Sequence, residues 1–146
     1  MTRIIGVDVG DKTLGVAVSD ELGLTAQGVT VHRRTSIRAD LAFLREILGR
    51  YDATAMVVGV PKNMDGSLGP QAEKTLAFIE RVRQSCPIPV VTWDERLTTQ
   101  EAERVLLEAN ASRQRRKRVR DRLAAQLILQ SYLEWRRRHP GDSLNR

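Results

Sequence analysis

The sequence is poor in the residues that build disulfide and zinc sites. The chain of 146 residues contains one cysteine, Cys86, and two histidines, His32 and His139, which lie far apart in the sequence. These counts exclude a disulfide framework, a zinc finger and a multi-histidine metal site. A chain of this length suits one domain, and it buries enough surface to fold without such cross-links.

Long hydrophobic runs are also missing. No apolar stretch approaches the roughly 18 residues of a membrane span. Asp8 and Asp11 interrupt the N-terminal region, where a signal peptide needs an apolar segment. We therefore expect a cytoplasmic protein without membrane attachment, either a monomer or a weak homodimer. We expect one domain over residues 1–138, followed by a flexible tail over residues 139–146.

Aromatic side chains are scarce, with two each of Trp, Tyr and Phe. Proteins that bind single-stranded nucleic acid stack successive bases on aromatic platforms. So few aromatic residues argue against such a platform and favour recognition of nucleic-acid shape.

Positive charge is abundant and unevenly placed. The formal net charge is +6, yet residues 113–138 alone hold ten basic and two acidic side chains, so the remainder of the chain carries a net charge of −2. Such a basic run is either a solvated helix surface or a patch for nucleic acid, anionic lipid or a protein target. The charge therefore suggests a polyanionic partner without identifying it.

Hydrophobic periodicity predicts an α/β fold. Short apolar runs rich in Val and Ile predict strands, and apolar residues at helical spacing predict helices. The first three strands are joined by connections too short for a crossover helix, so we expect an antiparallel meander, with the later strands parallel to the first. The result is a mixed five-stranded sheet with helices on both faces. The expected strands are about 3–9, 14–19, 27–32, 55–60 and 89–93, and the expected helices are about 36–49, 71–85, 98–109 and 119–137.

Acidic residues occur at the ends of two predicted strands. Asp8 lies inside the apolar run Ile4–Val9, and Asp94 and Glu95 directly follow a second strand. A carboxylate in such a place is costly unless it is paired or bound to a cation. Because side chains alternate along a strand, only one of Asp94 and Glu95 faces the same side as a shared site. Alternatively, Asp8 caps the following turn and the acidic pair caps the next helix.

A third acid, Asp121, lies within the basic segment. In a helix it shares a face with Ala124, Ala125, Ile128 and Tyr132, the residues expected to pack on the sheet. This phase turns Asp121 toward the body of the protein. Alternatively, Asp121 pairs with a basic residue on the preceding turn of its own helix.

The three acidic positions together predict a divalent metal site. Like charges held close together disfavour ionisation, and a hard cation relieves this conflict. Carboxylate oxygens are the ligands that Mg²⁺ and Mn²⁺ prefer. An acidic cleft beside a basic segment is suited to metal-dependent hydrolysis of phosphodiester bonds.

Several motifs resemble those of one known family, over residues from Ile4 to about Leu133. The stretches are GVDVG (6–10), GVA (15–17), VGVP (58–61), NMDG (63–66), DERLTT (94–99) and Asp121 before two alanines. The run Asp94–Thr99 and the Asn63–Gly66 loop are the most specific of them. In order and spacing these stretches are similar to the YqgF/RuvX family of pre-16S rRNA nucleases, also described as Holliday-junction-resolvase-like.

The resemblance implies an RNase H-like fold and a metal-dependent nuclease with Mg²⁺ or Mn²⁺. It implies that Asp8, Glu95 and Asp121 are the catalytic and metal-binding residues, with Glu95 favoured over Asp94. Family members are implicated in 5′-end processing of pre-16S rRNA, so structured RNA is the favoured substrate, and branched DNA is the alternative. The loop and basic-segment residues expected to contact nucleic acid are Lys12, Lys62, Asn63, Arg96, Arg115, Arg116, Lys117 and Arg118.

Two other functional classes stay open at this point. A non-catalytic RNA-binding assembly factor would use the basic segment but leaves the acidic positions without a purpose. A nucleotide-binding ATPase is suggested by residues 6–13, but their glycine spacing departs from that of a P-loop.

Overall fold

The structure is a computed structural model that describes residues 3–98 and 113–141, and within 113–122 it describes the backbone alone. Its elements, in chain order, are strands β1 (Arg3–Val9), β2 (Thr13–Ser19) and β3 (Ala26–Arg33), helix α1 (Ile37–Arg50), strand β4 (Ala53–Val60), helix α2 (Pro70–Ser85), strand β5 (Val90–Asp94), the 3-10 turn η1 (Glu95–Leu97) and helix α4 (Arg113–Arg138).

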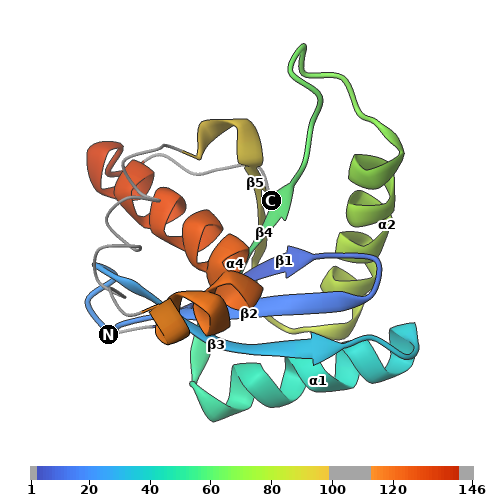
Figure 1. Cartoon of the computed structure of the whole chain (residues 1–146), viewed down its shortest axis with the longest axis horizontal. Coiled ribbons are helices and arrows are strands. Elements are labelled where there is room, and N and C mark those ends of the chain that lie inside the picture. Colours follow the sequence, from blue (N-terminus) through green and yellow to red (C-terminus); the bar gives the residue numbers. More distant parts are fainter. Residues whose placement is uncertain (1–2, 99–112, 142–146) are drawn as a thin grey trace.

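The five strands form one mixed sheet in the order β3-β2-β1-β4-β5 (Figure 1). The pairs β1–β2 and β2–β3 are antiparallel, whereas β4 runs parallel to β1 and β5 runs parallel to β4. The carboxyl ends of β1, β4 and β5 therefore meet at the same edge of the sheet. This arrangement confirms the predicted meander followed by parallel strands.

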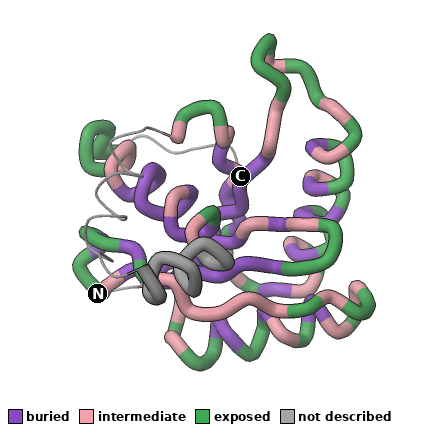
Figure 2. Tube along the Cα trace, in the orientation of Figure 1, coloured by how far each residue is buried: buried purple, intermediate pink, exposed green. Residues whose placement is uncertain are grey.

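Alternation along the strands divides the core into two layers. On β1, Ile5 and Val7 belong to the cluster that packs against α1 and α2, and Ile4 belongs to the cluster that packs against α4. The buried residues accordingly follow the central strands and the inner sides of the helices (Figure 2). The side chain of Asp8 shares the α4 side with Ile4, because the two are an even number of residues apart.

Two glycines let α4 lie directly on the sheet. A Cβ atom at Gly6 of β1 would lie 2.7 Å from the Cβ of Leu129, and one at Gly59 of β4 would lie 2.5 Å from the Cδ1 of Ile128. Any side chain at these positions would therefore collide with α4. A glycine inside a buried strand often marks such a close approach of another element.

Helix α4 differs from its prediction in two respects. It begins at Arg113 and not near residue 119, because the Arg, Lys and Gln residues of the basic run have high helix propensity and continue the helix. Ala124, expected on the packed face, is exposed, and the packed face is centred on Ala125, Ile128 and Leu129. The small side chain of alanine is compatible with either face of a helix, so the prediction that Ala124 belongs to the packed face was wrong.

The helix predicted over 98–109 lies, after its first residue, outside the described residues, and Thr98 itself ends η1, a turn that the sequence pattern did not predict. No helix within residues 3–98 or 113–141 is long and apolar enough to span a bilayer.

The contact between α4 and the sheet predicts the effect of adding one methyl group. Gly6→Ala should lower the free energy of unfolding by about 1–3 kcal/mol, because the new Cβ overlaps the Cβ of Leu129, which cannot rotate away. Gly49→Ala is the matched control, since nothing lies within 4 Å of its added Cβ on α1. Urea unfolding of this control should show a gain of up to about 1 kcal/mol. Equal effects at the two positions would contradict the close packing.

Candidate active site

The first carboxylate of the candidate site, Asp8, lies near the carboxyl end of β1 on the side that faces α4. It is half-buried, and this burial raises the pKa of its carboxyl group above the ordinary value. The register that pairs Val7 with Val58 places Asp8 beside Gly59 of β4. Because Gly59 has no side chain, the space over β4 next to Asp8 is left for another group.

Glu95 occupies that space from the end of β5. It is the first residue of η1, and its Cγ lies 3.1 Å from the position that a Cβ at Gly59 would take. The negative charge of Asp8 is one of the causes that raise the pKa of Glu95. The structure therefore brings Asp8 and Glu95 together across β4, as two half-buried carboxyl groups on the α4 face.

The environment of Glu95 works against its ionisation. Burial, then the charge of Asp8 and then that of Asp94, raise its pKa to about 7. No described residue donates a hydrogen bond to the carboxylate of Asp8 or of Glu95, and none forms an ion pair with either. A pair of close carboxylates without a partner in the described part of the chain fits a hard divalent cation, which would supply a compensating positive charge.

The third predicted carboxylate is not described in atomic detail. Asp121 lies on α4 one turn before Ala125, so its position follows the helical spacing of the residues that pack on the sheet. Its side chain is not among those that the structure describes. Among the described side chains there is accordingly no group of three or more metal-ligating residues. Asp8 and Glu95 are the two predicted ligands that the structure places together.

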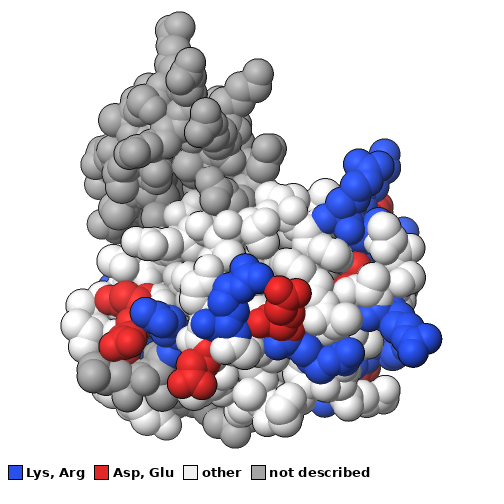
Figure 3. All heavy atoms as spheres, turned by 90° about the horizontal axis from the view of Figure 1, so that it is seen from below, with Lys and Arg blue, Asp and Glu red and all other residues white. Residues whose placement is uncertain are grey.

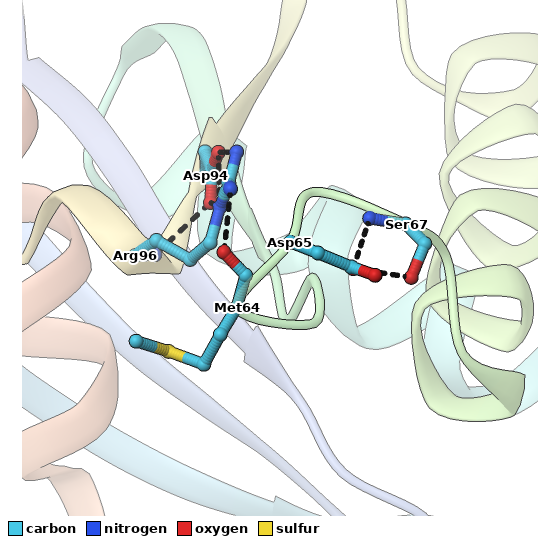
Figure 4. Close-up of polar contacts among 5 residues, drawn as sticks. All are labelled: Met64, Asp65, Ser67, Asp94 and Arg96. Carbon is cyan, nitrogen blue, oxygen red and sulfur yellow. Dashed lines mark hydrogen bonds and ion pairs between the residues drawn. The ribbon is translucent and has the colours of Figure 1, made fainter.

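Asp94 turns away from this pair and binds Arg96. Its carboxylate accepts hydrogen bonds from the Arg96 backbone N–H at 3.0 Å and from the guanidinium Nε and Nη2 at 3.0 Å and 2.7 Å (Figure 4). The hydrogen bonds from Arg96 lower the pKa of Asp94, whereas the pKa of Glu95 is raised. Asp94 lies an even number of residues after Val90, which packs on the α1 and α2 side, whereas Glu95 lies over Gly59 on the α4 side, so the predicted opposition of these two acids is confirmed.

Arg96 connects the edge of β5 to the loop that joins β4 to α2. Its Nη1 donates to the carbonyl of Met64 at 3.3 Å, and Gly66 packs so closely that a Cβ there would lie 3.3 Å from Nη1. The backbone at Gly66 has a φ of +87°, which favours glycine. Asp65 closes the turn by accepting from the backbone N–H and hydroxyl of Ser67 (Figure 4).

The other residues predicted to contact nucleic acid are spread around this edge. Lys12 is exposed in the turn after β1, and Lys62 is half-exposed after β4. Neither of these lysines forms an ion pair with a described residue, whereas Asn63 donates to the hydroxyl of Ser67 within its loop. The side chains of Arg115, Arg116, Lys117 and Arg118 lie outside the described residues, on the first turns of α4.

The described surface on the α1 side carries charges of both signs. In the view from below, basic and acidic side chains alternate over this face (Figure 3). This agrees with a chain whose net charge outside residues 113–138 is slightly negative. The excess of positive charge belongs to the segment that forms α4.

The contribution of Gly59 is absent from the predictions made from the sequence, and Arg96 is predicted there only to contact nucleic acid. The signal for Gly59 was present, because a glycine inside the apolar run of β4 indicates close packing. The Arg96 contact with Met64 depends on how a distant loop folds back, and nothing in the local sequence indicates it.

Comparison with known proteins identifies the family. The family model described as "RuvX: Holliday junction resolvase" matches residues 2–135. A relative from Symbiobacterium thermophilum, named "Putative pre-16S rRNA nuclease", is 56% identical over 141 residues, which cover 97% of this chain and 98% of the relative. The chain belongs to the RuvX family. Another RuvX relative with the same name, from Moorella thermoacetica, is 56% identical over 132 residues and covers 90% of this chain and 94% of its own.

Solved structures agree with the expected fold of a RuvX protein. The RuvC protein of T. thermophilus, in complex with a Holliday junction substrate, superposes with a TM-score of 0.64 over 95% of this chain and 97% of RuvC, at 16% sequence identity. The Holliday junction resolvase of fowlpox virus superposes with a TM-score of 0.53 over 92% of this chain and 99% of its own, at 15% identity. These similarities confirm the RNase H-like α/β fold.

The raised pKa of Glu95 predicts how stability depends on pH. Because the folded-state pKa of about 7 exceeds the ordinary value of 4.5, the folded protein holds a proton that the unfolded chain releases between these pH values. The free energy of unfolding contributed by Glu95 therefore falls as pH rises through this window. In chelator-treated protein, Glu95→Gln should melt several degrees higher than wild type at pH 8, and the difference should vanish near pH 4.

The matched control for this measurement is Glu46→Gln, which removes an exposed carboxylate paired with Arg50. Its melting temperature should equal that of wild type or lie slightly below it at pH 8, because exposed ion pairs contribute little. A Glu95→Gln variant less stable than wild type at pH 8 would contradict a destabilising charge at this position.

Proposed function

We propose that this RuvX protein is a divalent-metal-dependent nuclease that hydrolyses phosphodiester bonds in structured RNA, acting in 5′-end processing of pre-16S rRNA. The observation that carries the proposal is the juxtaposition of Asp8 and Glu95, two carboxyl groups that have no partner among the described residues, at the edge where three parallel strands end. The names of the relatives support the choice of substrate.

In this proposal Asp8 and Glu95, joined by Asp121 from α4, hold Mg²⁺ or Mn²⁺. A bound divalent cation supplies Lewis-acid activation of water and of the phosphate. Glu95 must release its proton to bind the cation, so we expect cation affinity to increase as pH rises through about 7. Asp94 positions Arg96 and, through it, the loop from Pro61 to Gly69 beside the site.

The basic residues then have the task of holding the substrate backbone. Lys12 and Lys62 flank the carboxyl edge and lack ion-pair partners among the described residues. The residues at positions 115–118 add positive charge at the start of α4. Phosphate contacts of this kind fix register and orientation without reading sequence. Asn63 and Arg96 are further predicted contacts, although Asn63 donates to Ser67 within its own loop and Arg96 donates to Asp94 and to the carbonyl of Met64.

Branched DNA is the second candidate substrate. It is favoured by the description of the family model and by the similarity in fold to a RuvC structure that contains a Holliday junction. The same carboxylates and the same basic segment would serve either substrate, because backbone neutralisation does not distinguish RNA from DNA.

Substitution of Asp8 tests the proposed chemistry. Asp8→Asn should reduce the rate of cleavage by more than about 100-fold in Mg²⁺ or Mn²⁺, beyond the 10–100-fold typical of groups that only orient a metal ligand. Cleavage should be measured in parallel on a pre-16S rRNA fragment with its 5′ extension and on a four-way DNA junction. Faster cleavage of the RNA supports the first substrate, and faster cleavage of the junction supports the second.

Asp52→Asn is the matched control for this experiment. Asp52 is exposed just before β4, at the opposite end of that strand from the site, and its φ of 52° is one that asparagine readily adopts. Its activity should equal that of wild type. Full activity of Asp8→Asn on both substrates would overturn the proposed site.

A further inference from the structure

A pocket of about 340 Å³ lies on the other side of the sheet from Asp8 and Glu95. Its apolar floor consists of Val9, Ile37 and Phe78, and the exposed Ala77 also lines it; Val9 and Phe78 belong to the core layer beneath α1 and α2. Asp8 and Val9 are consecutive, so the pocket and the carboxylate pair open on opposite faces of β1. The volume is at the small end of the range for small-molecule sites.

Arg34 is fixed at the wall of this pocket. Its Nε donates to Asp40 at 2.8 Å and its Nη1 donates to the carbonyl of Gly10 at 2.7 Å. Its guanidinium lies 4.9 Å from the ring centroid of Phe78. Asp40 is 1% exposed, so the anchor itself is buried. The remaining nitrogen, Nη2, has no hydrogen bond to a described residue and is available to a ligand.

Helix α2 adds further polar groups to the rim. Arg81 is exposed and makes no ion pair or hydrogen bond with a described residue, and it lies one turn after Phe78 on the same helix. Lys74 pairs only loosely with Asp11, at 3.8 Å, and both side chains are about two-thirds exposed. The Gln71 side chain has no described partner and offers both a donor and an acceptor.

These features define the chemistry of a ligand. An apolar floor that includes an aromatic ring suits a flat heterocycle, and two arginines lining the same pocket suit a phosphate group. We propose that the pocket binds a nucleoside monophosphate unit, with its base on Val9, Ile37 and Ala77 and its phosphate between Arg34 and Arg81. Gln71 then meets the polar edge of the base. The site does not depend on the proposed cleavage reaction, because its ligand binds away from the carboxylates.

Calorimetric titration of the metal-free protein with AMP and UMP tests this site. Both nucleotides should bind, and adenosine, ribose 5-phosphate and inorganic phosphate should each bind at least about tenfold more weakly, since each lacks the base or the phosphate. Ribose 5-phosphate or inorganic phosphate binding as tightly as AMP would overturn the role of the apolar floor. No heat or chemical-shift change with either nucleotide would overturn the site.

Two variants localise the binding. Arg81→Glu should weaken AMP binding at least about tenfold through loss of a charge-assisted contact. Ala77→Phe should abolish it by filling the pocket, at an exposed helical position where the larger side chain removes no existing contact. Arg50→Glu, with the same charge change about 20 Å along α1 from Ile37, should bind AMP within twofold of wild type. Equal affinity in all three variants would overturn the location.

The nucleotide has two possible sources, which a competition experiment separates. In the Asp8→Asn background, a 5′-phosphorylated single-stranded RNA hexamer is added to the AMP-bound protein. Displacement of AMP by the hexamer, together with weaker hexamer binding to Ala77→Phe in the same background, assigns the pocket to a nucleotide of an RNA strand. AMP binding that the hexamer leaves unchanged assigns it to free nucleotide. Failure of AMP to bind leaves the nuclease proposal intact, and full cleavage by Asp8→Asn, which would overturn the nuclease proposal, leaves the pocket intact.

Discussion

The close contact between α4 and the sheet is the constraint on which the candidate site depends. Gly6 and Gly59 lie on neighbouring strands, and both are needed for Leu129 and Ile128 to reach the sheet surface. The same absence of a side chain at Gly59 lets Glu95 extend from β5 over β4 toward Asp8. One packing feature therefore seats the helix that carries Asp121 and leaves room for two carboxyl groups to meet.

The sheet separates two kinds of electrostatic environment. On the α4 face, half-buried carboxyl groups without described partners have raised pKa values. On the α1 and α2 face, the buried carboxylate of Asp40 is paired with Arg34, and the surplus charge at the pocket is positive. The first environment attracts a cation and the second attracts an anion. Consecutive residues of β1 thus lead to sites of opposite preference.

Much of this fold was predictable from the sequence, because alternating and helical apolar patterns are local signals. The meander, the parallel strands and the opposite directions of Asp94 and Glu95 follow from such patterns. The start of α4 and the exposure of Ala124 do not, since a run of basic residues and a lone alanine carry little information on phase. The contacts of Arg34 with Asp40 and Gly10 depend on tertiary packing, which no local pattern encodes.

The central claim is that Asp8 and Glu95 form the core of a divalent cation site. Anomalous diffraction from crystals soaked in Mn²⁺ at pH 8, where Glu95 is mostly ionised, tests this claim most directly. We expect an anomalous peak within coordination distance of both carboxylates. A saturating soak that places Mn²⁺ elsewhere, or that leaves both carboxylates without an ion, would contradict it.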